Sequence, residues 1–206
     1  MIAAVIPAAG RSQRMGRPKL TLPIQGVPLI ARVILALRQG GAERIVVVVP
    51  PAFEDGSAKL VRIAKEQGAE TIIPDFQPPD MRVSVEIGLQ HLSRGIEPRG
   101  VLVTPGDTPG IHAACVTMII ERWQFEPASI VVPLHQGRRG HPVLFPWSLA
   151  LRIGQLPSGV GVNAMLAEHC DRVVSIDLED PSILEDIDTP EDYRFWAESG
   201  GTFEGE

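Results

Sequence analysis

The chain has 206 residues, of which 44% are hydrophobic and 21% charged, and its formal net charge is −6. This size suits a single domain, and no apolar run approaches the roughly 20 residues that a membrane-spanning helix requires. Residues 177–206 hold eleven acids and one base, which leaves residues 1–176 at +4 without the basic stripe of a nucleic-acid-binding protein. We therefore expect neither a membrane nor nucleic acid as a partner.

The first residues, MIAAVIPAAG, show neither the basic region nor the cleavage site of a secretory signal. Cys115 and Cys170 lie far apart without a neighbouring Cys or His at metal-ligand spacing, so neither a disulfide scaffold nor a zinc site is expected. Both thiols are expected to be buried, in a protein of the cytoplasm, where thiols stay reduced.

Apolar strand-like runs alternate along the chain with longer segments of helical periodicity. Strands are predicted at 2–7, 44–49, 70–73, 100–104 and 129–132, and helices at 28–38, 57–67, 81–92 and 111–123. The runs IAAVIP, RIVVVV and GVLVT are continuously apolar, as strands covered on both faces are. This alternation predicts an α/β fold with a three-layer, Rossmann-like, mostly parallel sheet, and ligands at the carboxyl ends of its strands.

The pattern changes after residue 132. Residues 133–145 resemble a loop that leads into a short strand, and 146–155 and 160–169 resemble short helices. Residues 172–177 can return as a strand, and Thr189 and Pro190 suit the cap and first position of a last helix. We expect one domain over residues 1–198, with an elaboration at about 133–170 beside a second substrate, and a frayed tail over 199–206.

The first predicted strand ends in a glycine-rich turn, IPAAGRSQRMGRPKL, which carries Arg11, Arg14, Arg17 and Lys19 and no acid. The turn matches neither GxxxxGK[ST] nor GxGxxG. Its main-chain N–H groups and basic side chains are nevertheless suited to surround a triphosphate, and Gly10 allows a ligand to approach closely. The alternative is a solvated basic loop without a ligand.

The segment AAGRSQRMGRPKLTLPIQGVPLI resembles the signature AAGxSxRMGxxKxLLPxxGxPLL of the MobA-like molybdenum cofactor nucleotidyltransferases, which have the nucleotide-diphospho-sugar transferase fold. The resemblance implies that this loop wraps the triphosphate of the donor, and that Arg14 and Lys19 are catalytic because they stabilise charge on the leaving pyrophosphate. Arg11 and Arg17 fall at variable positions of the signature. The loop residues expected to contact the nucleotide are Ala8, Ala9, Gly10, Arg11, Ser12, Arg14, Met15, Gly16 and Lys19.

Two acidic motifs lie far from this loop in the sequence. Asp107 in VLVTPGDTPGI follows a predicted strand, either as a turn aspartate or as a metal ligand, and the resemblance implies that GDxP is a magnesium motif. In DIDTPEDY, Asp186 and Asp188 are two residues apart and share one face of an extended segment. Mg²⁺ commonly takes one or two carboxylates with phosphate oxygens and water, so we expect Asp107 with Asp186. Asp188 is the second choice, because it can instead orient the loop or cap the following helix.

The donor nucleotide is indicated by two stretches. Ala9 and Pro18-Lys19 follow the cytidylyl pattern of the family, which favours CTP. Ser84 matches the family stretch SVxxGL, which implies a place near cytosine; the alternative is a helix cap or surface serine. The family usually has Gly-Met before these residues, as in RGMxSSV, whereas this chain has Pro78-Pro79-Asp80-Met81-Arg82, which makes the loop stiffer and differently charged.

The acceptor side is indicated by GRRGHPVLF, which resembles the family's GxxGHPVLF. The resemblance implies that Gly140, His141 and Pro142 shape the pocket of the second substrate, with Arg138 or Arg139 available to its phosphate. For His141 the alternative is a role in loop packing.

These features predict a Mg²⁺-dependent cytidylyltransferase, in which an acceptor phosphate attacks the α-phosphorus of CTP and releases pyrophosphate. The resemblance implies molybdopterin as the acceptor and a molybdoenzyme client as a candidate partner. One alternative is a sibling enzyme that uses GTP or a sugar or polyol phosphate. Another is a non-catalytic protein that delivers the molybdenum cofactor to an apoenzyme.

Overall fold

The computed structural model describes residues 1–199 of the chain. Its strands are β1 (Ile2–Pro7), β2 (Pro23–Ile24), β3 (Val27–Pro28), β4 (Arg44–Val48), β5 (Glu70–Ile72), β6 (Gly100–Val103), β7 (Ile130–His135), β8 (Arg138–Arg139), β9 (Val143–Pro146) and β10 (Val173–Asp177). Its α-helices are α1 (Leu29–Gln39), α2 (Ser57–Glu66), α3 (Met81–Leu92), α4 (Ala113–Phe125), α5 (Trp147–Ala150), α6 (Ala164–Glu168) and α7 (Pro190–Ser199). Apart from Ser199, the tail expected to fray lies outside the described residues.

One large sheet forms the centre of the structure, with the strand order β10-β7-β9-β6-β1-β4-β5 and with β8 paired to β7. The pairs of β1 with β4 and β6, of β4 with β5, and of β10 with β7 are parallel, whereas β8 and β9 run antiparallel to their neighbours. The predicted mostly parallel α/β sheet is therefore confirmed.

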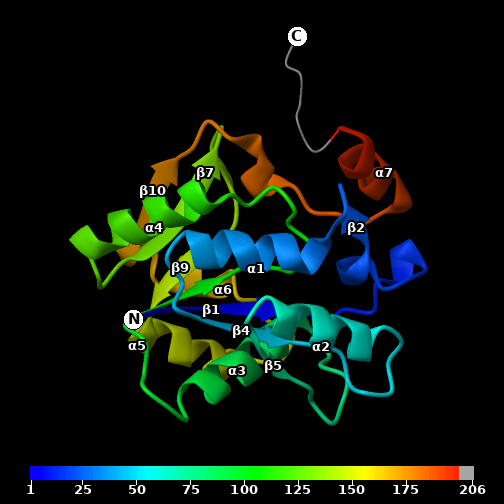
Figure 1. Cartoon of the computed structure of the whole chain (residues 1–206). Helices are drawn as coiled ribbons and strands as arrows, with labels where there is room; N and C mark the ends of the chain where they lie inside the picture. The colour runs from blue at the N-terminus through cyan, green and yellow to red at the C-terminus, as the bar shows by residue number, and fades with distance from the viewer. Residues whose placement is uncertain (200–206) are drawn as a thin grey trace.

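Helices cover both faces of this sheet, and the alternation of residues along β1 shows how. Ala4 and Ile6 pack into a core with α1, α2 and α4, whereas Ala3 and Val5 pack into a second core with α3, α5 and α6. In Figure 1, α1 and α4 lie above the strands, and α3 and α5 lie below them. This arrangement is the predicted three-layer architecture.

Helix α3 has a cap at its start and packs closely on the sheet. The Asp80 side chain caps the helix by accepting a hydrogen bond from the Val83 N–H over 2.9 Å. At Gly88, a Cβ atom would lie 2.5 Å from Val5 Cγ1, so the absence of a side chain lets the helix pack tightly on β1. Ser84 lies on α3 between these two positions and lines a cleft together with Pro7 and Pro105.

The predicted elements between residues 2 and 132 are present within a few residues of their expected ends. The loop expected over 133–145 was wrong in its first half, because β7 continues to His135 and turns back into β8. Gln136 and Gly137 have φ angles of +49° and +76°, which suit a two-residue hairpin turn. Gln25 and Gly26, with φ angles of +49° and +81°, turn β2 into β3 in the same way.

The two cysteines differ in burial. Cys115 is buried as predicted, whereas Cys170 is exposed, because it lies in a short turn that leads into the edge strand β10. A search of the described residues finds no helix with the length and apolar character needed to cross a membrane.

Candidate active site

The glycine-rich loop leaves the carboxyl end of the central strand β1. The Ala8 N–H donates to the Val48 carbonyl, which holds the start of the loop on the sheet, and the main-chain carbonyl of Ser12 accepts from Met15 and Gly16 at the turn of a short 3₁₀-helix (Gln13–Met15). Met15 is buried in the core. The Met15 side chain therefore anchors the loop to the core, and Gly16, which has a φ of +64°, closes the turn.

The exposed part of the loop offers hydrogen-bond donors. Among residues 1–199, the main-chain N–H groups of Gly10, Arg11 and Ser12 have no hydrogen-bond acceptor. A Cβ atom built on Gly10 has nothing within 4 Å. This part of the loop can therefore receive an anionic ligand against its backbone.

Lys19 is the cation that lies deepest in this region. Its ammonium group contacts Asp107 Oδ2 at 2.6 Å, the Ile187 carbonyl at 2.7 Å and Asp188 Oδ1 at 3.0 Å. Its side chain is only 12% exposed. Burial lowers the pKa of Lys19, but the attraction and hydrogen bonds of Asp107 and Asp188 outweigh it, so the net pKa is raised and the group remains charged at neutral pH.

Two arginines of the loop are also paired with acids. Arg14 contacts Asp188 Oδ2 at 2.8 Å, and Arg11 contacts Glu54 Oε1 at 2.9 Å. Partial burial would raise the pKa of Asp188, but Lys19 and then Arg14 stabilise its charged form, so the net pKa is lowered. Asp188 therefore binds one cation with each of its oxygen atoms.

Main-chain contacts bring the distant acidic segments together. The Ile187 N–H donates to the Asp107 carbonyl over 3.0 Å, and the His141 N–H donates to the Ile183 carbonyl over 3.0 Å. The buried Ser182 hydroxyl also donates to the main chain, at the Gly110 carbonyl. These bonds hold residues 182–187 beside the loop that follows β6.

The start of α7 fixes the orientation of Asp188. The Asp192 carboxylate accepts from the N–H groups of Asp188 and Thr189, and the Thr189 hydroxyl accepts from the Asp192 N–H over 3.2 Å. Thr189 is thus the helix cap that the sequence predicted, and Asp192 completes a reciprocal capping arrangement.

Asp186 has a different position from Asp188. Its side chain is exposed and borders a groove of about 820 Å³ between α7 and the β7–β8 hairpin. Partial burial and then repulsion from Asp188 and Asp107 raise the pKa of Asp186, so it lies within electrostatic reach of both carboxylates. The carboxylate that shares Lys19 with Asp107 is nevertheless Asp188, the second choice of the sequence analysis.

A cleft of about 620 Å³ runs from these acids along the glycine-rich loop. Its lining includes Ala8, Ala9, Gly10, Arg11, Ser12, Arg14, Lys19, Ser84, Asp107 and Asp188. Ser84 is buried on the first turns of α3, and Asp80 caps that helix, so neither alternative for Ser84, a helix cap or a surface residue, is correct.

The sequence analysis did not identify Gln77, which also lines this cleft. The Gln77 amide nitrogen donates to the Ala9 carbonyl over 2.7 Å and so ties the segment before α3 to the glycine-rich loop. Gln77 lies before two prolines in an irregular segment, where periodicity gives no signal of such a contact.

The residues expected on the acceptor side lie at the β8–β9 connection. Arg139 is exposed, Gly140 and Pro142 are buried, and the Gly140 N–H donates to the Pro133 carbonyl over 2.9 Å. Burial lowers the pKa of the His141 ring, although nearby Asp107 opposes this shift. This segment thus lies beside Asp107 and also holds the acidic segment through Ile183.

The family described as the MobA-like NTP transferase domain matches residues 4–173, which include the glycine-rich loop and Asp107. The chain belongs to the MobA-like NTP transferase family. It is therefore a nucleotidyltransferase, as the sequence analysis predicted.

Relatives of this MobA-like transferase differ in their substrates. It is 27% identical to the molybdenum cofactor cytidylyltransferase of Escherichia coli, with 93% of each chain covered. It is 28% identical to the 2-C-methyl-D-erythritol 4-phosphate cytidylyltransferase of Streptomyces avermitilis, with 90% of this chain and 79% of the relative covered. Both relatives are named cytidylyltransferases, but their names give different acceptors.

Solved structures share the fold of the MobA-like transferase. A nucleotidyl transferase from Methanothermobacter superposes with a TM-score of 0.79 at 21% identity, with 97% of both chains covered. A Mycobacterium tuberculosis protein, solved as a complex with manganese, superposes with a TM-score of 0.76 at 23% identity, with 96% of this chain and 98% of that chain covered.

Proposed function

We propose that this MobA-like transferase transfers CMP from CTP to a phosphate acceptor and releases pyrophosphate. The acceptor that we propose is molybdopterin, whose product would pass to a molybdoenzyme client. The proposal is supported by the cytidylyl form of the loop and by the Escherichia coli relative, which is named a molybdenum cofactor cytidylyltransferase.

One observation carries the proposal: Asp107 and Asp188 converge on the Lys19 ammonium at the edge of the cleft. Two carboxylate oxygens and the Ile187 carbonyl already surround a cation there. Oxygen ligands of this kind suit Mg²⁺ or Mn²⁺, which need only one or two carboxylates when phosphates and water supply the rest. No group of three or more acidic, His or Cys side chains suited to a metal occurs in residues 1–199, so phosphate oxygens would complete the coordination.

We propose that Asp107 and Asp188 hold Mg²⁺, with Asp186 close enough to add to the negative field. When bound, such an ion would supply positive charge that neutralises the phosphates of donor and acceptor. Arg14 and Lys19 would bind the phosphates and stabilise the leaving pyrophosphate, while the N–H groups of the loop orient the triphosphate.

The cytosine would lie at the other end of the cleft. Ser84 is buried there at the start of α3, where its hydroxyl can contact a base, and Gln77 closes the same wall. Ala8 and Ala9 have small side chains, which leave room for a base beside their main chain.

The acceptor would approach from the side of the β7–β8 hairpin. Arg139 is exposed and could contact a phosphate, and Gly140, His141 and Pro142 would form the wall next to Asp107. Guanidinium groups bind phosphate through two parallel hydrogen bonds, which suits Arg139 to this role.

Pyrophosphate release tests the proposal. The protein is incubated with Mg²⁺, each of CTP, GTP, UTP and ATP, and either molybdopterin or sugar and polyol phosphates. We expect turnover with CTP and molybdopterin, and a loss of about 100-fold or more in Asp107→Asn. Turnover with GTP alone, or with a sugar or polyol phosphate, would establish the sibling enzyme instead.

The non-catalytic alternative makes a different prediction. A delivery protein would release no pyrophosphate with any pair of substrates, and Asp107→Asn would still bind molybdopterin and activate an apoenzyme. Circular dichroism of Asp107→Asn controls for loss of folding in both assays.

A further inference from the structure

The cations of the glycine-rich loop are largely neutralised by acids of the same chain. The ion pairs are Arg11 with Glu54, Arg14 with Asp188, and Lys19 with both Asp107 and Asp188. The remaining basic residue, Arg17, lies over the ring of Tyr193, 5.4 Å from its centre. A triphosphate that enters the cleft therefore meets cations that already have partners.

Lys19 is the most fully engaged of these residues. A lysine ammonium has three protons to donate, and Lys19 has three oxygen acceptors within 3.0 Å. Its side chain is largely buried, so water does not screen these contacts as it does at the surface. No proton is left for a phosphate unless one of the three acceptors is given up.

The carboxylates are neutralised in the same way. The Asp107 Oδ2 and Asp188 Oδ1 atoms that would bind a metal are the atoms that contact the Lys19 ammonium. A metal ion and this ammonium group cannot occupy the same place between the two oxygens. Binding of one must move the other.

We propose that Lys19 is the internal counter-ion of Asp107 and Asp188, and that a divalent cation displaces it and thereby frees it to bind the triphosphate. This inference rests on the proposed role of the two aspartates as metal ligands. Metal and triphosphate then bind best together, because each makes the other's site available, and such coupling is reciprocal. Metal alone binds weakly, because it must first break the contacts of Lys19.

Lys19 should affect the binding of metal and the binding of nucleotide in opposite directions. A lysine that serves only to bind phosphate has no effect on the affinity of the nucleotide-free protein for metal. A lysine that competes for the carboxylates lowers that affinity. Removing Lys19 should therefore tighten the binding of metal even though it weakens the binding of nucleotide.

Binding of Mn²⁺ alone, followed by electron paramagnetic resonance without nucleotide, tests this directly. We expect Lys19→Met to lower the Kd for Mn²⁺ about tenfold, the scale on which one close charge shifts the binding of a cation to a carboxylate. Arg17→Gln is the matched control, because it removes one positive charge from the same loop without touching either aspartate. Its Kd should stay within about twofold of the unaltered protein.

The outcomes separate this inference from the proposed function. If Asp107→Asn abolishes Mn²⁺ binding but Lys19→Met leaves the Kd unchanged or raises it, the counter-ion role is wrong and the metal site stands. An equal gain in Mn²⁺ affinity in Arg17→Gln would also overturn the counter-ion role, because the effect would then come from the net charge of the loop. If Asp107→Asn leaves Mn²⁺ binding unchanged, the proposed metal site itself fails. Should Lys19→Met fold poorly, Lys19→Gln is the second variant, because it keeps a neutral hydrogen-bond donor between the aspartates. We expect it to lower the Kd for Mn²⁺ in the same way.

Discussion

A Cβ atom on Gly140 would lie 2.6 Å from the carbonyl oxygen of Ile183, so only glycine fits where the β8–β9 connection passes the C-terminal acidic segment. The neighbouring His141 N–H donates to the same carbonyl over 3.0 Å. The side of the molecule assigned to the acceptor thus also sets the position of the acidic segment that carries Asp188.

Gly140→Ala should therefore disturb stability and activity together. The obstacle is a main-chain atom that cannot rotate away, and forced overpacking of this kind costs about 1–3 kcal/mol. We expect urea unfolding to show a loss of that size, and pyrophosphate release to fall because Asp188 moves relative to Lys19. Gly161→Ala, where a Cβ atom meets nothing within 4 Å, is the control that should remain stable.

Gly10→Ala should have the opposite profile. A Cβ atom there meets no protein atom within 4 Å, so the free energy of unfolding should not fall. The added methyl group would instead occupy the space where we place the triphosphate. We expect calorimetry to show CTP binding weakened about tenfold or more, on the scale of 1–3 kcal/mol for an inserted methyl group. Unchanged CTP affinity would mean that the ligand does not approach the loop at Gly10.

The sequence predicted those parts of the fold that depend on local periodicity. Continuously apolar runs located β1, β4 and β6 closely, because strands covered on both faces can contain little else. The hairpins at Gln25-Gly26 and Gln136-Gly137 were not predicted, because glutamine seldom adopts a positive φ and is a weak turn signal. The insertion of β9 between β6 and β7 depends on pairing between distant segments, which periodicity does not encode.

The candidate site was predictable to a similar extent. The loop motif and the two acidic motifs supplied the residue types. Asp186 and Asp188 are two residues apart and share one face of an extended segment, so their spacing cannot decide which of them contacts Lys19. That choice depends on the capping of α7 by Thr189 and Asp192, which turns Asp188 toward Lys19. The burial of Lys19 also could not be read from its place in a basic, glycine-rich loop.

The two cysteines should differ sharply in reactivity. Burial, with a smaller contribution from Asp180, raises the pKa of Cys115 to about 12, whereas Cys170 is exposed. Because the thiolate is the reactive form, iodoacetamide at pH 8 should modify Cys170 and leave Cys115 unmodified until the protein unfolds. Mass spectrometry of tryptic peptides gives the sites. Early modification of Cys115 in folded protein would contradict the packing around α4.

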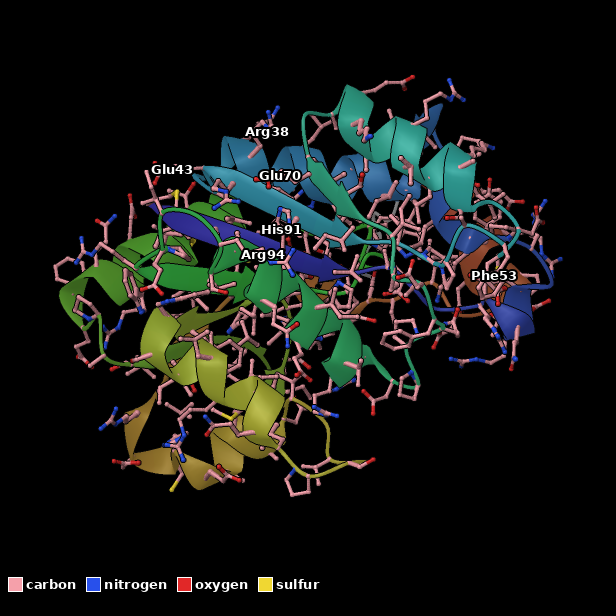
Figure 2. All side chains as sticks on the ribbon, turned by 90° about the horizontal axis from the view of Figure 1, so that it is seen from below. Arg38, Glu43, Phe53, Glu70, His91 and Arg94 are labelled. Atoms are coloured by element: carbon pink, nitrogen blue, oxygen red, sulfur yellow. The ribbon has the colours of Figure 1, made fainter. Side chains whose placement is uncertain are left out.

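At the edge of the sheet, Glu70 lies beside His91 (Figure 2), and Arg44 also contacts its carboxylate. Arg44 donates to both of its carboxylate oxygens, at 2.9 and 3.1 Å, and His91 Nε2 lies 2.7 Å from Oε2. The hydrogen bond from Arg44 and then that with His91 lower the pKa of Glu70 below its ordinary 4.5, against partial burial.

Glu70→Gln should reduce stability at neutral pH and have less effect in acid. Because the folded-state pKa is the lower one, this carboxylate stabilises the fold above its unfolded pKa, and the contribution is lost as pH falls through the folded value. The group is 40% exposed, so we expect at most about 1 kcal/mol at pH 7. Urea unfolding at several pH values should show the difference from the unaltered protein shrinking below about pH 4. Glu66→Gln, which removes an exposed ion pair with Arg62, is the control. If the loss of unfolding free energy in Glu70→Gln grew in acid, Arg44 would not hold this carboxylate in its charged form.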